Sequence, residues 1–277
     1  MSWLVIALLL ASAIIHAGWN ALVKGNADRL WSISVISLFG GLAALPFALL
    51  FGLTTTASLA FIAASSCLQV GYTLFLVRAY DHGDLAQVYP IARGTAPLLV
   101  TLGAAVFAEE FPEGATLAGI AFVSIGILAL STGKGRANWK ALISAFAAGC
   151  FIASYMLVDG FGVRVSQNAL GYAAWQAVVA GFLIPLTFVA IRRKFPPPPA
   201  GRDGAVIATA GVLSTLGYCI AIWAMSAAPM GGVSALRETS ILFAALFSAF
   251  MLREQLTVRK AIGAILITAG VVSFSMV

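Results

Sequence analysis

The segment VYPIARGTAPLLV places reactive side chains inside an otherwise apolar run. Tyr89 and Arg93 are four residues apart, so they share one face if the segment is a helix. Pro90 and Pro97 each lack a backbone donor and can bend such a helix. A buried arginine needs water or a partner, because an unpaired charge among apolar groups is costly. Two roles stay open for Arg93: binding a ligand carboxylate, or a structural role that caps carbonyls freed by proline or pairs with Glu238.

Similar polar faces occur in other apolar runs. His16, Trp19 and Asn20 follow one another at spacings of three and four, which puts an imidazole, an indole and an amide on one helical face. Interhelical hydrogen bonding could explain any one of these faces. Aromatic and amide groups with an arginine nearby indicate a cavity for a neutral or zwitterionic solute whose side chain is apolar or aromatic. The predicted substrate-binding residues are His16, Trp19, Asn20, Gln69, Tyr72, Tyr89, Arg93, Trp175, Gln176 and Tyr218.

Other residues suggest movement or charge coupling. Arg237 lies beside Glu238, so an ion pair or local network is expected there rather than substrate contact. Proton coupling could use His16 or Glu238, although nothing in the sequence requires coupling over facilitated export. The residues predicted to permit gating are Pro90, Pro97, Gly231 and Gly232.

The composition identifies the surroundings of these residues. The 277-residue chain is 61% hydrophobic and 9% charged, with a mean hydropathy of +1.00, whereas soluble domains are about 25% charged. This is an integral membrane protein. The start MSWLV lacks a positive region, so the first run is expected to be a retained helix rather than a signal peptide. Ten apolar runs are predicted to span, near 3–23, 31–52, 58–79, 85–108, 115–132, 139–159, 168–191, 203–226, 231–251 and 258–276.

The charged residues indicate topology rather than a nucleic-acid partner, although the net charge is +6. Alternate loops between the predicted helices lie on the same side of the membrane, and on one side the only basic residue in the loops is Arg164. The basic side is predicted to be cytoplasmic, which places both termini outside. The three cysteines lie in apolar runs and suggest no disulfide or metal framework, and no cofactor is expected. The other set of connections carries Lys24, Arg29, Arg78, Lys134, Arg136, Lys140, Arg192, Arg193, Lys194, Arg202, Arg253, Arg259 and Lys260.

The two halves of the sequence repeat each other. AEEFPEGATLAG at 108–119 aligns with LREQLTVRKAIG at 252–263, a shift of 144 residues. The predicted repeats are therefore 1–132 and 139–277, each with five helices. Because five is odd, the second copy enters the membrane from the opposite side, which makes an inverted repeat suited to alternating access. The same shift aligns Arg93 with Arg237, Thr95 with Thr239, Gly119 with Gly263 and Gly126 with Gly270.

The chain resembles a known family in several motifs. These are GWNALVKG at 18–25, FAEE at 107–110 and MLRE at 251–254, within a plan of ten helices in two halves. The chain resembles the EamA type of the drug/metabolite transporter superfamily, and within it the amino-acid exporters of bacterial inner membranes, the YddG-like proteins among them. The resemblance implies a multi-pass inner-membrane protein that exports a small metabolite through a central cavity. In such a membrane, the termini that the loop charges place outside would be periplasmic.

The resulting prediction is an all-α membrane protein of ten transmembrane helices in two inverted five-helix repeats around a central cavity. It would export neutral, apolar or aromatic amino acids by alternating access, as a monomer in the lipid bilayer. Other metabolites or drugs remain alternative substrates. An intramembrane enzyme is disfavoured because His16 and His82, the two histidines, lack the partners of a hydrolase or a metal site.

Overall fold

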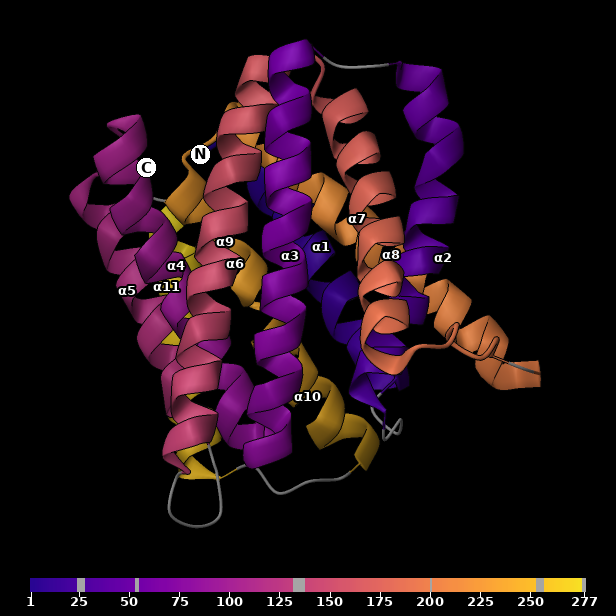
Figure 1. Cartoon of the computed structure of the whole chain (residues 1–277). Helices are drawn as coiled ribbons and strands as arrows, with labels where there is room; N and C mark the ends of the chain where they lie inside the picture. Colours follow the sequence, from indigo (N-terminus) through magenta and orange to yellow (C-terminus); the bar gives the residue numbers. More distant parts are fainter. Residues whose placement is uncertain (24–27, 53–54, 132–137, 200, 253–256, 276–277) are drawn as a thin grey trace.

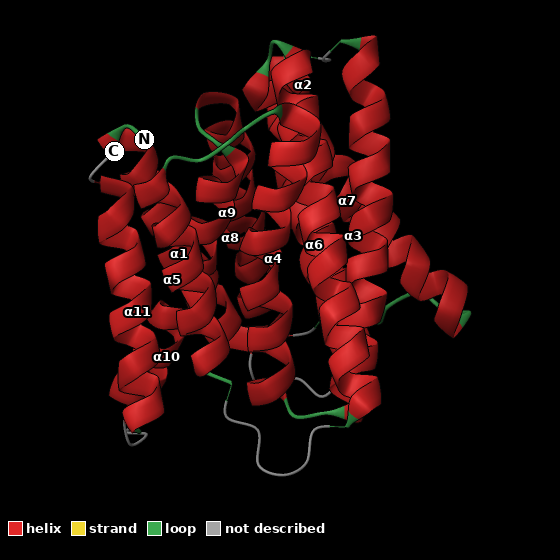
Figure 2. Cartoon of the chain, turned by 90° about the vertical axis from the view of Figure 1, so that its left-hand side faces the viewer, coloured by secondary structure: helices red, strands yellow, loops and turns green. Residues whose placement is uncertain are grey.

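A computed structural model describes the chain except for residues 24–27, 53–54, 132–137, 200, 253–256 and 276–277. Every regular element in these described residues is an α-helix (Figure 2). The helices are α1 (Trp3–Val23), α2 (Arg29–Phe51), α3 (Thr56–His82), α4 (Leu85–Ala108), α5 (Gly114–Ala129), α6 (Trp139–Ser166), α7 (Ala169–Arg192), α8 (Gly201–Ala227), α9 (Met230–Glu238), α10 (Ser240–Leu252) and α11 (Val258–Ser275).

The helices coincide with the ten predicted apolar runs. Nine segments of the described chain are long and apolar enough to cross a membrane, one of them formed by α9 and α10 together. The helix α5 is shorter, with 16 residues, or about 24 Å at 1.5 Å per residue. Helices satisfy their own backbone polar groups, which is why such apolar segments adopt them in lipid. The chain is therefore an all-α membrane protein, as predicted.

Two helix boundaries differ from the prediction. The ninth run divides into α9 and α10 at Thr239, whose hydroxyl donates to the Leu236 carbonyl at 2.6 Å and whose N–H donates to the same carbonyl at 3.3 Å. This turn is tighter than an α-helical one. The helix α6 continues to Ser166 instead of ending at Asp159. Asp159 is tolerated inside the helix because two tyrosine hydroxyls bond its carboxylate.

Successive helices run up and down through the bundle. Figures 1 and 2 show both termini at the same end of the molecule. The most extensive helix contacts join α3 to α6, α2 to α7, α5 to α11 and α4 to α6, so each half of the chain packs against the other. The basic residues of the described helix ends, such as Arg29, Lys140 and Lys260, lie opposite the termini, and Arg164 lies at the terminal end. Lys24, Lys134, Arg136 and Arg253 lie outside the described residues.

Glycines allow two of these helix pairs to approach closely. A Cβ placed on Gly126 would lie 2.8 Å from the Gly263 carbonyl oxygen, and one on Gly119 would lie 3.0 Å from the Gly270 carbonyl oxygen. The backbones of α2 and α7 meet in the same way at Gly41 and Gly181. Small residues let membrane helices pack through their backbones. The glycines aligned by the repeat thus pack within one chain.

We predict that Gly126→Ala lowers the stability of the protein, because the added methyl must push α5 away from α11. The expected loss is about 1–3 kcal/mol, typical of overpacking, measured as a lower thermal unfolding midpoint in detergent. Gly18→Ala is the matched control, since a Cβ there meets no atom within 4 Å. Equal midpoints for the two variants would contradict this account of the α5–α11 contact.

Candidate substrate cavity

A cavity of about 610 Å³ lies inside the bundle, bordered by helices from both halves of the chain. Its polar lining includes Arg29, Tyr80 and Lys260, which lie near helix ends opposite the termini. From there it extends inward to Tyr218 and Arg237. The cavity therefore reaches the basic end of the molecule. Its volume falls within the roughly 300–1,000 Å³ common for small-molecule sites.

The structure brings most of the predicted binding residues to this cavity. The exception is Trp175, whose indole N–H donates to the Gly52 carbonyl at 3.1 Å, at the terminal end of the bundle. Side chains on a helix lean toward its N-terminus, so the long indole of α7 reaches past the cavity. Trp175 and Gln176 are adjacent in the helix and therefore point in different directions, so only one of them reaches the cavity. The residues at the cavity are His16, Trp19, Asn20, Gln69, Tyr72, Tyr89, Arg93, Gln176 and Tyr218.

The predicted gating residues are more dispersed. Pro90 lines the cavity, whereas Pro97, Gly231 and Gly232 are not part of its lining. A Cβ on Gly231 would meet the side chain of Thr101, so this glycine packs against α4 near the terminal end. Both prolines lie inside α4, which continues through them. Their contribution to gating stays a prediction.

Arg93 is bound by residues from two other helices. Its Nη1 donates to both carboxylate oxygens of Glu238, at 2.9 and 3.1 Å, and its Nη2 lies 3.1 Å from Nε2 of His16. The guanidinium also lies 5.2 Å from the centre of the Tyr89 ring. Glu238 is fully buried, and Arg93 is 5% exposed. Of the two roles open for Arg93, the structure shows the pairing with Glu238.

Arg237 makes contacts different from those of Arg93 and of Glu238, its neighbour in sequence. Its guanidinium lies over the ring of Tyr218, 4.6 Å from the ring centre, and its Nη1 lies 3.9 Å from the sulfur of Met156. The expected ion pair between Arg237 and Glu238 is not found among the described residues, because consecutive helical residues point in different directions. The carboxylate of Glu238 turns to Arg93 instead.

Four tyrosines and a buried acid form a layer near Arg237. The ring of Tyr155 packs edge-on against those of Tyr72 and Tyr218, with centres 6.0 and 5.7 Å apart. Tyr218 donates its hydroxyl to Asp159, and Tyr172 donates to the same carboxylate at 2.9 Å. Asp159 is fully buried and fixes Tyr218 beneath Arg237. Sequence reasoning missed Tyr155, although its spacing of four from Asp159 in an apolar helix was a usable signal.

Several donors in the cavity have no protein partner among the described residues. They include Nε1 of Trp19 and the Nε2 atoms of Gln69 and Gln176, all buried. Asn20 is oriented differently, since its Nδ2 donates to the His16 carbonyl at 2.8 Å and leaves Oδ1 as an acceptor. Buried polar atoms without partners are unusual in proteins. The cavity thus offers hydrogen bonds to a polar ligand.

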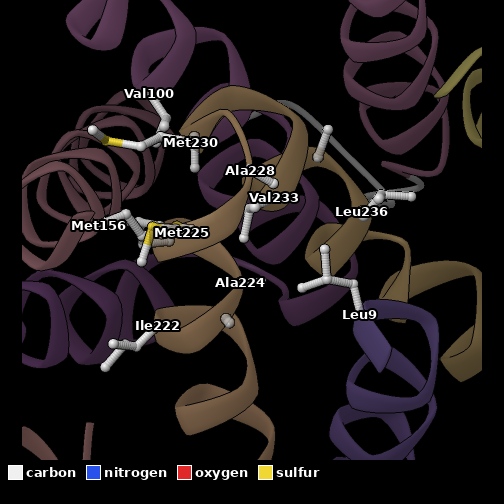
Figure 3. Packing of buried hydrophobic residues seen from close by; sticks show 14 of the residues in the cluster. Leu9, Val100, Met156, Ile222, Ala224, Met225, Ala228, Met230, Val233 and Leu236 are labelled. Carbon is white, nitrogen blue, oxygen red and sulfur yellow. The ribbon is translucent and has the colours of Figure 1, made fainter. Parts of the chain in front are cut away.

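The opposite end of the bundle is filled by apolar side chains. Figure 3 shows Leu9, Val100, Met156, Met225 and Met230 converging from several helices, and each is fully buried. This group is called the apolar plug below. None of its residues lines the cavity, and Met225 and Met230 lie at helix ends on the side of the termini.

A polar network covers the outer side of the apolar plug. Glu110 and Arg164 form an ion pair of 2.5 Å, and Glu110 also accepts from the Met230 N–H at 2.9 Å. Arg164 donates to the carbonyls of Met225 and Ala228, at 2.9 and 3.2 Å. These bonds connect the segment before α5 and the end of α6 to the α8–α9 junction.

Comparisons with known proteins agree with this architecture. The model of the EamA-like transporter family matches residues 139–276, the second half of the chain. A crystal structure with 18% sequence identity superposes with a TM-score of 0.79, covering 99% of this chain and 98% of the other. At this identity the likeness shows the fold alone. No curated protein matches the sequence.

We predict that Glu238→Gln destabilises the protein by about 3–5 kcal/mol, because it leaves the Arg93 charge buried without its carboxylate. The double variant Arg93→Gln/Glu238→Gln should recover most of this loss, since no buried charge remains. Thermal unfolding in detergent measures both effects. The control is Asp28→Asn, which keeps a capping side chain on α2 but removes the exposed ion pair between Asp28 and Arg192, whose atoms are 3.8 Å apart. This variant should lose less than about 1 kcal/mol of stability. A double variant no more stable than Glu238→Gln would contradict the pairing energetics.

Proposed function

The chain belongs to the EamA-like transporter family of the drug/metabolite transporter superfamily, and on this basis we propose that it exports amino acids by alternating access. The family and the membrane-spanning helices make it a membrane transporter of small molecules. The finer proposal concerns which solute moves, how the path opens and in which direction. We propose that the solute is a neutral amino acid with an apolar or aromatic side chain.

The cavity is the observation that carries this proposal. It lies inside the bundle, has room for a metabolite of amino-acid size and reaches one end of the molecule. Aromatic rings such as Tyr72 and Tyr89 offer apolar surface, while Gln69 and Gln176 offer amide groups. Such a mixture of apolar walls and a few polar groups is typical of small-molecule sites.

The buried charges support a zwitterionic solute. Arg93 and Arg237 are the buried basic residues of the described bundle, and Asp159 and Glu238 are the buried acids. With both acids ionised, these four charges cancel. The buried interior, farther in than Arg29 and Lys260 near the cavity mouth, thus has no net charge from these residues. Such an interior suits a zwitterion better than a cation or a multiply charged anion, because either ion would leave an excess charge in a low dielectric.

Alternating access is supported by the unequal ends of the bundle. One end has the cavity mouth, whereas the other has the apolar plug and the Glu110–Arg164 network. An exporter must be able to close the first end and open the second. The glycine contacts suggest how this could happen. Gly119 packs on Gly270, which is the repeat counterpart of Gly126, and Gly126 packs on Gly263, which is the repeat counterpart of Gly119. This reciprocal contact supports two inverted halves that can exchange conformations.

The charges at the two ends support the direction of transport. Basic residues favour the cytoplasmic side, so the cavity mouth would face the cytoplasm of a bacterial cell. The termini and the apolar plug would face the periplasm. In this orientation the structure corresponds to the state that accepts cytoplasmic solute before export. The working unit is proposed to be a monomer, because one chain supplies both halves of the cavity.

We predict that purified protein in vesicles exchanges neutral apolar or aromatic amino acids across the membrane. The assay loads vesicles with each unlabelled amino acid in turn and measures uptake of its radiolabelled form, which should be saturable. Ala244→Trp fills part of the cavity wall and should reduce exchange by roughly tenfold or more, the factor produced by about 1.4 kcal/mol of lost binding free energy. Ala60→Trp, on an exposed face of α3, is the control. The proposal fails if no amino acid is exchanged by the wild type.

We predict that the basic end faces the cytoplasm. In a variant without native cysteines, Asn138→Cys should be protected from an impermeant thiol reagent in intact cells, whereas Gly114→Cys should be labelled. Both positions are exposed in the structure and lie at opposite ends of the bundle. Lysed cells provide the control, in which both positions should react. The reverse labelling pattern in intact cells would turn the exporter model around.

A further inference from the structure

The two arginines at the cavity have different surroundings. The charge of Arg93 is matched by the Glu238 carboxylate through two hydrogen bonds, and a third contact occupies its Nη2 atom. The guanidinium of Arg237 contacts an aromatic face and a thioether sulfur, and forms no ion pair with any described residue. Both side chains are buried, at 5% and 7% exposure. Of these two buried arginines, Arg237 is therefore the one whose charge a ligand can match.

We propose that Arg237 is the residue that recognises the carboxylate of the transported solute, and that Arg93 is structural. This inference deepens the proposed function and depends on it for the identity of the ligand. The sequence left both roles open for Arg93, and it placed Arg237 in an ion pair or local network rather than in contact with the substrate. The change follows from which arginine the buried acids engage in the folded protein.

The buried acids explain why Arg237 remains available. Glu238 is the next residue in sequence but bonds to Arg93. Asp159 accepts hydroxyl donors from Tyr172 and Tyr218, which occupy both of its carboxylate oxygens. Arg237 stacks over the ring of Tyr218, whose hydroxyl bonds to Asp159, and in the described structure no hydrogen bond or ion pair joins it to the acid itself. A cation over an aromatic face is attracted to it but keeps its N–H donors, which point around the edge of the guanidinium plane.

Other donors that line the same cavity as Arg237 also favour an anionic ligand. Gln176 is 1% exposed, and its Nε2 has no hydrogen-bond partner among the described residues. Gln69 provides a second such Nε2 on the cavity wall. A carboxylate accepts several hydrogen bonds and fits the planar fork of a guanidinium. A phosphate dianion would exceed the charge of Arg237, the buried arginine without an ion pair among the described residues, so a monoanionic carboxylate is the better fit at this depth.

Tyr218 acts as a positioning residue in this site. Its hydroxyl donates to Asp159, and its ring supports the Arg237 guanidinium. The edge-on contact with Tyr155 holds the ring from another side. Loss of the hydroxyl should loosen the ring without removing the cation. A Tyr218→Phe variant should therefore weaken carboxylate recognition less than removal of the arginine does.

The test compares L-phenylalanine with L-phenylalaninamide, which lacks the carboxylate charge. Thermal stabilisation of the detergent-purified protein reports binding, because a ligand that binds the folded state raises its unfolding temperature. Competition with labelled phenylalanine in vesicles reports transport. Arg237→Gln should weaken binding of the acid by roughly 10-fold to 150-fold, as expected for a lost charge-assisted hydrogen bond, and change that of the amide little. Arg237→Lys should restore part of the preference, since lysine lacks the planar fork.

The matched control removes the other arginine together with its acid. Whatever its overall rate, Arg93→Gln/Glu238→Gln should keep the preference for acid over amide, because Arg237 remains. Loss of the preference in this double variant, with the preference kept in Arg237→Gln, would overturn the proposal. Equal weakening of acid and amide in Arg237→Gln would also overturn it. If Arg237→Gln does not fold, Tyr218→Phe decides: an unchanged preference for the acid contradicts the proposal, and a reduced preference supports it.

The two proposals can fail separately. If the wild type exchanges no amino acid but is stabilised more by the acid than by the amide, and Arg237→Gln loses this difference, then the transport proposal fails while the carboxylate site stands. If the wild type exchanges phenylalanine and Arg237→Gln retains the full preference for the acid, then the carboxylate site fails while the transport proposal stands.

Discussion

The Arg93–Glu238 ion pair is the interaction on which the rest of the cavity depends. Two charges deep in a membrane protein are tolerable only if each satisfies the other, since lipid supplies no water to either. The pair joins α4 to α9, and therefore the first half of the chain to the second. It also uses the one acid that sequence proximity would have given to Arg237. The bonds that stabilise the junction of the halves thus leave a cation facing the cavity.

The partners of Asp159 in the tyrosine layer also leave Arg237 without an ion pair. Asp159 could have neutralised Arg237, but its oxygens accept hydroxyls from Tyr172 and Tyr218. Arg237 is stacked on one of these rings instead, so the acid orients the cation without pairing with it directly. An arginine fully paired with an acid would be less costly to bury, but it would have no unmatched charge to bind a solute.

The ends of the bundle differ in what must be broken for movement. At the basic end the cavity already reaches the surface beside residues such as Lys260. At the terminal end, opening would have to separate the apolar plug and the bonds of Glu110 and Arg164. The Glu110–Arg164 bonds are part-exposed, so water can replace them at modest cost. The methionines of the plug are flexible side chains that can repack as helices shift.

The sequence by itself determined the all-α membrane fold and nearly all helix positions, because apolar runs of spanning length have one solution in lipid. Most of the polar and aromatic residues that it assigned to a cavity do line one, since polar groups in such helices must face inward. The sequence could not determine which partner each polar group takes. The indole of Trp175 extends past the cavity, and Tyr155 lines the cavity. Glu238 pairs with Arg93 and not with the adjacent Arg237. These outcomes depend on side-chain direction and on contacts between distant helices, which only the tertiary structure decides.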